Sequence, residues 1–318
     1  MNVLIVDDSV VFRAAISDAL EEEKNIRIVG KASNGKLALE KLKKVSVDLI
    51  ILDMEMPFMD GIETIKNIRK DDSKTAILVF STLTSFGAKK TIEALTHGAD
   101  DFLAKTVNGE DFDKNVQIIK ENLVPKVRQF LPRFAHTSKA DQKDMGLVHQ
   151  ENISKKEKKS SLNHFFKKVI CIGSSTGGPD ALRKLFTQLQ NRSGVPILIA
   201  QHMPPLFTGQ LAKMLDKISP IKVKEAVHGE KVLQNTGYIA PGDFHMTVKN
   251  KNKEIYIELN QEERVNNVRP AVDILFSSVA EAYGANSIAV VLTGMGEDGR
   301  VGAKNLQAKG APVKECYC

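Results

Sequence analysis

The 318-residue sequence has no tryptophan, few other aromatic residues and only three cysteines. Aromatic residues make up 6% of the chain, so aliphatic side chains must fill most of any hydrophobic core. Cys171, Cys316 and Cys318 match neither a disulfide framework nor a zinc-ligand spacing. No run approaches the roughly 18 apolar residues of a membrane-spanning helix, so we expect no membrane insertion. The first apolar residues lead straight into two aspartates, without a basic start or a cleavage site, and we expect a cytoplasmic protein.

The net charge of +6 raises the question of a nucleic-acid partner. Much of the basic excess lies between residues 139 and 168 rather than on one recognisable helix, which is typical of a solvated linker. The second half also lacks a helix-turn-helix signal and carries an α/β pattern instead. We therefore expect no nucleic-acid binding and reject a DNA-binding regulator.

The order of apolar patterns predicts an α/β protein with two domains. Residues 1–123 contain five strand-like runs, each followed by a helical pattern, which predicts a doubly wound parallel sheet. Periodicity then fades into a polar linker over residues 124–166. A second doubly wound α/β domain is expected over residues 167–318. The predicted strands lie at 2–6, 26–29, 48–52, 76–80, 101–104, 169–172, 196–200 and 287–292, with further β-like segments at 246–248 and 255–259.

Acidic residues follow two strands of the first predicted sheet. Asp7 and Asp8 follow the first strand and Asp53 ends the third, while Ser81 and Lys105 end the fourth and fifth. Because the carboxyl ends of parallel strands meet at one edge, these side chains should converge. Three carboxylates together repel one another unless a hard cation such as Mg²⁺ lies among them. Asp53 could then act as a nucleophile toward a phosphoryl group, although single acids at strand ends are commonly turn or cap residues.

Several short motifs in this half resemble the receiver domain of response regulators. They are VDDS at 6–9, LDMEMP at 52–57, MDG at 59–61 and GADDF at 98–102, together with Lys105. The resemblance implies a flavodoxin-like fold in which a sensor histidine kinase phosphorylates Asp53. It also implies that Asp8, Asp53 and the backbone carbonyl of Glu55 hold Mg²⁺ with help from Asp7, and that Ser81, Phe102 and Lys105 form the switch.

Three loops in the second half carry groups that could perform hydrolysis. They are GSSTGGP at 173–179, QHMPP at 201–205 and TGMGEDG at 293–299, each directly after a predicted strand. Ser175, His202 and Asp298 would supply a nucleophile, a base and an orienting acid. Taken singly, the serine loop could be a cap or a phosphate cradle, the histidine a structural residue and the acid a solvated turn.

Together the three loops resemble the catalytic domain of chemotaxis protein-glutamate methylesterases. Further matching stretches are IAPGDFHM at 239–246 and RPAVDILF at 269–276, within a resemblance that spans residues 169–310. It implies a Rossmann-like serine hydrolase that needs no cofactor for the esterase reaction. It further implies a triad of Ser175, His202 and Asp298, with Thr176 and Met295 at the oxyanion, and glutamate methyl esters or glutamines of chemoreceptors as substrates.

The resemblance also implies regulation, because in this family the unphosphorylated receiver covers the catalytic face. The tail at 311–318 does not resemble the family's continuation, so we expect a second domain that is incomplete at its C-terminus, with weak or absent esterase activity. Two functions stay open from the sequence. One is a phosphorylation-activated esterase and deamidase, and the other is a phosphorylation-dependent binding protein with an inactive hydrolase half.

Overall fold

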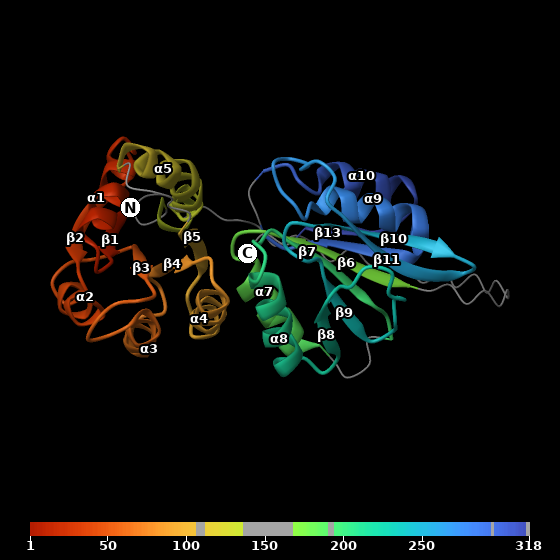
Figure 1. The fold of residues 1–318 in the computed structure, drawn as a ribbon, viewed down its shortest axis with the longest axis horizontal. Helices are drawn as coiled ribbons and strands as arrows, with labels where there is room; N and C mark the ends of the chain where they lie inside the picture. The colour runs from red at the N-terminus through yellow and green to blue at the C-terminus, as the bar shows by residue number, and fades with distance from the viewer. Residues whose placement is uncertain (106–111, 136–167, 190–193, 294–295, 316–318) are drawn as a thin grey trace, which may run out of the picture.

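The computed structural model describes residues 1–105, 112–135, 168–189, 194–293 and 296–315. These residues form two α/β domains that lie side by side, each built around a parallel sheet (Figure 1). Both predicted doubly wound sheets are therefore confirmed. Most of the predicted linker falls outside the described residues, which resume at Lys168.

The first domain is a five-stranded sheet in the order β2-β1-β3-β4-β5 with helices on both faces. This order belongs to the flavodoxin-like fold, whose functional groups gather at the carboxyl ends of the strands. All five residues of β3 are buried, as a central parallel strand requires. The elements are β1 Asn2–Val6, α1 Val10–Glu21, β2 Arg27–Ala32, α2 Gly35–Leu42, β3 Leu49–Asp53, α3 Gly61–Asp71, β4 Ala76–Thr82, α4 Ser85–Thr96, β5 Asp101–Lys105, α5 Phe112–Arg128 and α6 Leu131–Ala135.

Side-chain caps fix where the helices of this domain begin. The side chains of Ser9, Asn34, Asp60 and Thr84 each accept a hydrogen bond from a backbone N–H in the first turn of α1, α2, α3 and α4. Each cap satisfies an N–H that the helix itself leaves unpaired. The caps thereby end each loop close to the carboxyl edge of the sheet, where the acidic residues lie.

The second domain contains a six-stranded parallel sheet in the order β13-β12-β6-β7-β9-β8. Residues 313–315 of the tail supply its edge strand, which pairs with β12. An antiparallel hairpin of β10 and β11 stands apart from this sheet, which the sequence had indicated only as β-like segments. The elements are β6 Val169–Ser174, α7 Gly178–Gln188, β7 Ile197–Gln201, α8 Phe207–Ile218, β8 Lys222–Glu225, β9 Thr236–Ile239, β10 His245–Lys251, β11 Glu254–Asn260, α9 Val272–Tyr283, η1 Gly284–Asn286, β12 Ser287–Val291, α10 Arg300–Ala308 and β13 Val313–Glu315.

The two domains share a packed interface. Helix α4 of the first domain packs against α7 and α8 of the second, as Figure 1 shows at the centre of the molecule. The rings of Phe102 on β5 and Phe207 on α8 stack across the interface, with centroids 4.8 Å apart and planes 8° from parallel. Buried residues from both domains join one hydrophobic cluster through this contact, so the first domain is held against the second.

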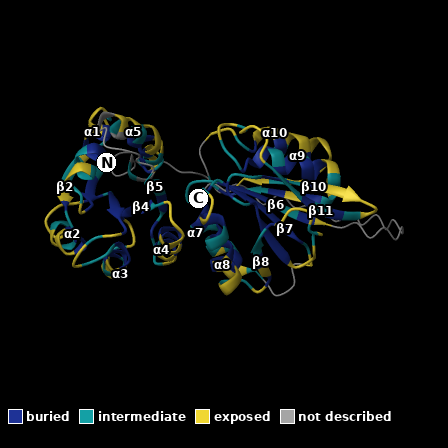
Figure 2. Cartoon of the chain, in the orientation of Figure 1, coloured by how far each residue is buried: buried dark blue, intermediate teal, exposed yellow. Residues whose placement is uncertain are grey.

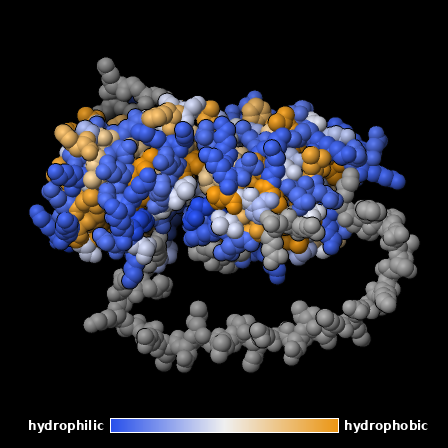
Figure 3. All heavy atoms as spheres, turned by 90° about the horizontal axis from the view of Figure 1, so that it is seen from below, coloured by the Kyte–Doolittle hydropathy of each residue, from blue (hydrophilic) through white to orange (hydrophobic). Residues whose placement is uncertain are grey.

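Burial follows the sheets. Central strands such as β3 and β7 are buried along their whole length, whereas exposed residues lie on the outer helix faces, the loops and the outer strands β2, β10 and β13 (Figure 2). The face in Figure 3 is mostly hydrophilic, with hydrophobic patches scattered over both domains. Within the described ranges, no helix combines the length and the apolar character that crossing a bilayer demands.

Candidate functional site

The first site is the acidic pocket at the carboxyl edge of the first sheet. Carboxylate oxygens of Asp7, Asp8 and Asp53 all lie within 4.8 Å of one another. The ammonium of Lys105 lies 2.8 Å from Asp53 Oδ1 and 3.1 Å from Asp7 Oδ2. Parallel strand ends bring these residues together although they are distant in sequence. The structure thus places four of the predicted residues in one pocket.

Burial dominates the electrostatics of this pocket. It raises the pKa of Asp53 to about 6, an effect that Lys105 opposes and Asp7 reinforces. Burial alone would lower the pKa of Lys105, but the two carboxylates outweigh it and raise that pKa instead. One ammonium faces three carboxylates, so the pocket keeps an excess of negative charge and of oxygen donors. Such a set fits a divalent hard cation, which takes carboxylate and carbonyl oxygens.

Glu55 and the switch residues lie around this pocket in different ways. Glu55 is exposed two residues after Asp53, and its backbone carbonyl as an ion ligand stays a prediction. Ser81 is buried at the end of β4, and its Oγ donates to the carbonyl of Gly87 on α4 at 3.1 Å. Phe102 turns away from the pocket and stacks on Phe207. The predicted switch positions therefore link the acidic pocket to α4 and to the second domain.

The second site forms where the loops after β6, β7 and β12 meet. The N–H of Ser175 donates to the carbonyl of Thr293 at 2.9 Å, and the Oγ of Thr293 donates to the carbonyl of Thr176 at 2.5 Å. The N–H of His202 donates to the carbonyl of Ser174 at 3.0 Å. These bonds tie the serine loop to its neighbours on both sides. These hydrogen bonds hold the loops after β6, β7 and β12 together at one edge of the sheet.

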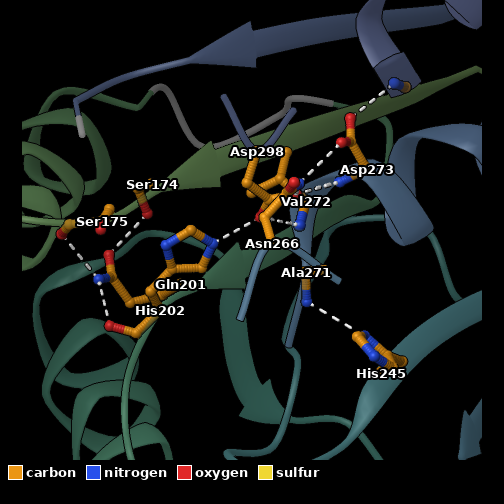
Figure 4. Close-up of polar contacts among 11 residues, drawn as sticks. Ser174, Ser175, Gln201, His202, His245, Asn266, Ala271, Val272, Asp273 and Asp298 are labelled. Carbon is orange, nitrogen blue, oxygen red and sulfur yellow. Dashed lines mark hydrogen bonds and ion pairs between the residues drawn. The ribbon is translucent and has the colours of Figure 1, made fainter. Parts of the chain in front are cut away.

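His202 and Asp298 form a direct pair. His202 Nε2 lies 2.6 Å from Asp298 Oδ2 (Figure 4). The backbone N–H groups of Val272 and Asp273, at the start of α9, donate to the same carboxylate at 2.7 and 3.0 Å. Asn266 Nδ2 adds a contact to Asp298 Oδ1 at 3.2 Å. A helix N-terminus favours a carboxylate, so the acid is held in place and ionised.

The pKa of Asp298 reflects this arrangement. Burial alone would raise it, but the hydrogen bonds from His202 and from the two backbone N–H groups outweigh burial and hold the pKa below its usual value. An ionised partner at Nε2 keeps a proton on that nitrogen and leaves Nδ1 free to accept one. Nδ1 lies on the side of the ring that faces the turn at Ser174 and Ser175 (Figure 4). No hydrogen bond joins Ser175 Oγ to His202 in the part of the chain that is described, and apo hydrolase sites commonly show a looser contact here.

Gln201 is a structural contributor that sequence reasoning missed. Its side chain is buried at the end of β7 and reaches all three neighbouring groups of the site. Nε2 donates to the carbonyls of Ser175 at 2.8 Å and His202 at 3.2 Å, and Oε1 accepts from Ser174 Oγ at 2.6 Å. A buried amide with both ends satisfied fixes its neighbours firmly. Its position next to His202 was the available sequence signal.

Asn266 and Asp273 are two further residues whose part the sequence did not indicate. Asn266 Nδ2 lies 3.2 Å from Asp273 Oδ2 as well as from Asp298, so one amide joins two carboxylates. Asp273 Oδ1 accepts from the N–H of Gly302 at 2.7 Å, which connects α9 to α10. Asp273 lies within the stretch at 269–276 that carried the resemblance, whereas Asn266 carried no signal.

A cavity of about 490 Å³ lies between the two domains and opens onto Ser175 and His202. The first domain contributes Phe102 and Lys126 to its lining. Lys126 Nζ lies 2.6 Å from Asp101 Oδ2 and 3.4 Å from the Oγ of Thr176, the residue after the serine. The first domain thus reaches the catalytic-type loop directly. Met295, predicted beside the oxyanion, lies outside the described residues.

Comparison with known proteins identifies the family of each domain. The sequence profile of the CheB methylesterase matches residues 170–314, and that of the response regulator receiver domain matches residues 3–117. A protein-glutamate methylesterase/protein-glutamine glutaminase of Trichodesmium erythraeum is 39% identical over 98% of this chain and 87% of its own length. One of Nocardioides is 40% identical over 98% of this chain and 84% of its own length.

A solved structure, the CheB methylesterase catalytic domain of Thermotoga maritima, is 46% identical and covers 46% of this chain and 77% of its own, with a TM-score of 0.45. The family resemblances drawn from the sequence are confirmed by the two profiles and by the near full-length relatives. With a receiver domain joined to a methylesterase domain along one chain, the protein belongs to the protein-glutamate methylesterase/protein-glutamine glutaminase family.

Proposed function

We propose that this chain is a phosphorylation-activated hydrolase that removes methyl groups from glutamate γ-methyl esters on the cytoplasmic domains of methyl-accepting chemoreceptors. The same site would deamidate receptor glutamines, as the names of the relatives state for those proteins. The observation that carries the proposal is the His202–Asp298 pair beside Ser175, at a cavity partly lined by the receiver. Receptor substrate and kinase partner both place the reaction in the cytoplasm.

The chemistry follows from the two nitrogens of His202. Asp298 holds the proton on Nε2, so Nδ1 takes the proton of Ser175 Oγ as that oxygen attacks the ester carbonyl. The tetrahedral intermediate then collapses, the C–O bond to the methoxy group breaks, and Nδ1 returns the proton to release methanol. A water repeats the sequence on the acyl-enzyme and releases glutamate. With a glutamine substrate the leaving group is ammonia.

The oxyanion of this intermediate needs donors that are not already engaged. The N–H of Ser175 donates to Thr293, so it is occupied. We assign stabilisation to groups of Thr176, which lies just before α7, and of Met295, which the resemblance implies. Gln201 supports them by fixing the carbonyl of Ser175.

Phosphorylation of Asp53 by a chemotaxis histidine kinase supplies the control. Asp8, Asp53 and the carbonyl of Glu55, with Asp7, would hold Mg²⁺. When bound, the ion supplies positive charge that neutralises the phosphoryl oxygens. Lys105 already contacts Asp53 and would pair with the phosphoryl group.

The two sites are coupled through the interface between the domains. Ser81 lies between the acidic pocket and α4, and Phe102 on the adjacent strand stacks on Phe207. A phosphoryl group that draws Ser81 and Lys105 toward Asp53 would disturb these contacts. The population would then shift toward an arrangement in which receptor helices reach Ser175.

Methanol release from methylated chemoreceptors tests this function. The full chain is assayed with and without phosphoramidate and Mg²⁺, beside Ser175→Ala and Asp53→Asn. We expect release to rise with phosphodonor, to fall at least about 1,000-fold in Ser175→Ala, and to lose only its activation in Asp53→Asn.

The alternative from the sequence is a phosphorylation-dependent binding protein with an inert hydrolase half. It predicts phosphorylation of Asp53 with no methanol release above the Ser175→Ala background under any condition. That result would replace the proposed esterase.

A further inference from the structure

The cavity between the two domains has more cations than acids in its lining. Its charged lining residues, apart from His202, are the acids Asp101 and Asp243 and the cations Lys126, Arg264 and Arg269. Lys126 Nζ lies 2.6 Å from Asp101 Oδ2, so these two neutralise each other. One acid and two arginines remain. One of the two arginines therefore keeps a positive charge that the lining does not neutralise.

Arg269 is the arginine that neutralises Asp243. Its Nε and Nη2 lie 3.1 and 2.7 Å from Asp243 Oδ1, and its Nη1 donates to the backbone carbonyls of Gln261 and Glu262 at 2.8 and 2.7 Å. The hydrogen bonds from Arg269 are the main reason that the pKa of Asp243 lies below its usual value. Arg269 thus has a structural role, and most of its donors are used inside the protein.

Arg264 is the second arginine, and it has donors to spare. Its Nη2 lies 3.5 Å from the same Oδ1 of Asp243, which is longer than a normal N–H···O hydrogen bond, and its side chain is 61% exposed. Glu262 and Glu263 precede it in the chain, but neither lines the cavity that the described residues form. A guanidinium presents its N–H donors in a planar fork that matches a carboxylate. The cavity therefore holds a carboxylate-binding group whose capacity the protein itself does not use.

The turn at residues 265–268 fixes Arg264 relative to the triad. The first carbonyl of the turn accepts from its last N–H at 3.0 Å, and its two central asparagines have φ of 53° and 63°. Asparagine tolerates this left-handed backbone better than most side chains do. The side chain of Asn266 in this turn lies 3.2 Å from Asp298 Oδ1 (Figure 4). The acid of the triad thus anchors the turn that carries Arg264 into the cavity.

The substrate is the remaining source of a carboxylate for Arg264. The ester that Ser175 attacks is uncharged, so the reacting group gives this guanidinium no counter-charge. On a helix, residues three or four positions apart lie on the same face, with Cβ atoms about 5–6 Å from each other. We infer that Arg264 determines specificity by binding the carboxylate of a glutamate that lies one helical turn from the target residue of the receptor. This inference rests on the proposed esterase function.

An order of hydrolysis along the receptor follows from this role. Water converts a γ-methyl ester to a carboxylate and methanol, or a glutamine to a carboxylate and ammonia, so each reaction adds a negative charge to the helix. That new carboxylate is the group which Arg264 binds when the enzyme acts one turn away. Each reaction therefore favours the next one on the same face of the helix.

Two synthetic helical receptor fragments test this specificity. Each carries one glutamate γ-methyl ester, with either glutamate or methionine four residues before and after it. Methionine has a similar length and offers the site nothing to hydrolyse. Methanol release is measured with saturating phosphoramidate and Mg²⁺, so that the receiver is in the same state for both fragments. We expect kcat/KM of the parent chain to be about threefold to fivefold higher for the acidic fragment, mainly through a lower KM, as suits an exposed ion pair.

Three variants show whether Arg264 is the cause of this preference. Arg264→Gln removes the charge, and the ratio of kcat/KM between the two fragments should fall to about 1.5 or less. Arg264→Lys keeps the charge without the fork and should retain part of the preference. Lys222→Gln removes an exposed charge that lies outside the cavity, at the start of the edge strand β8, and should keep the whole ratio.

Several outcomes would overturn the assigned role of Arg264. They are equal kcat/KM for the two fragments in the parent chain, an unchanged ratio in Arg264→Gln, and an equal fall of the ratio in Lys222→Gln. A loss in Arg264→Gln that is confined to kcat and equal for both fragments would also overturn it, because it would indicate a disturbed triad instead. If the parent chain releases methanol from neither fragment, the proposed esterase function fails, and the inference fails with it.

Discussion

Gln201 offers a sharp test of how the catalytic-type loops are held together. Its side chain is 1% exposed and donates to the carbonyls of Ser175 and His202 while accepting from Ser174. Gln201→Glu keeps the shape of the side chain but removes both N–H donors. When ionised, the introduced carboxylate places a negatively charged oxygen next to the carbonyl oxygens of Ser175 and His202, which repel it. When protonated, it can still donate one hydrogen bond, so the effect must depend on pH.

The size of the effect follows from the lost bonds. At pH 5 one buried carbonyl loses its donor, which costs about 1–3 kcal/mol of unfolding free energy. Burial raises the pKa of the introduced carboxyl above that of the unfolded chain, so stability is retained at low pH and lost as pH rises. The loss is about 1.4 kcal/mol for each pH unit between the unfolded and the folded pKa, so the deficit should be larger at pH 7 than at pH 5, by up to about 3 kcal/mol.

Urea unfolding of the full chain at both pH values measures this difference. The chain has no tryptophan, so far-ultraviolet circular dichroism is the suitable probe. Gln201→Met loses the same donors without an ionisable group, and its deficit should be equal at pH 5 and pH 7. If Gln201→Glu lowers the unfolding free energy not at all, or equally at both pH values, the proposed role of Gln201 in holding the loops together is refuted.

Three other predictions concern the acid of the triad and the domain interface. In Asp298→Asn the new NH₂ must face two hydrogen-bond donors, because each carboxylate oxygen of Asp298 accepts from two groups. We expect kcat for methanol release to fall about 10³–10⁴-fold with little change in KM. A loss below tenfold would contradict the assigned role of Asp298. Because the pKa of Asp298 is lowered in the folded state, its ionised carboxylate adds to the unfolding free energy at a pH above the ordinary aspartate range. The parent chain should lose this part of its unfolding free energy on acidification, whereas Asp298→Asn should lack it at every pH. Phe102→Leu removes a ring stack worth about 0.5–1.5 kcal/mol, so methanol release without phosphodonor should rise roughly 2–10-fold; equal basal rates would show that the stack does not hold the domains closed.

The sequence predicted the acidic pocket well because parallel sheets obey a strong topological rule. Asp7 directly follows β1 and Asp53 is the last residue of β3, and the carboxyl ends of both strands lie on one edge of the sheet. The same rule brought Ser175, His202 and Asp298 to one edge of the second sheet. Motif spacing and strand order were therefore sufficient to predict that these groups lie close together.

Other parts of the fold gave weaker signals. The sequence reading assigned no helix at α8, although its apolar residues at Phe207, Leu211 and Leu215 repeat every four positions. The β10–β11 hairpin showed only as β-like runs, because pairing direction is set by the partner strand. The importance of α8 became clear only when Phe207 was seen to stack on the other domain.

The sequence by itself determined the family, the two α/β domains and the identity of the reactive groups, since these depend on local periodicity and on residues next to strand ends. Only the tertiary structure decided which nitrogen of His202 faces Asp298, how Gln201 joins the loops after β6 and β7, and where the receiver meets the second domain. It also showed that Phe58 has a left-handed backbone conformation and an exposed side chain. Side-chain contacts between distant segments depend on packing in three dimensions, and no one-dimensional pattern records them.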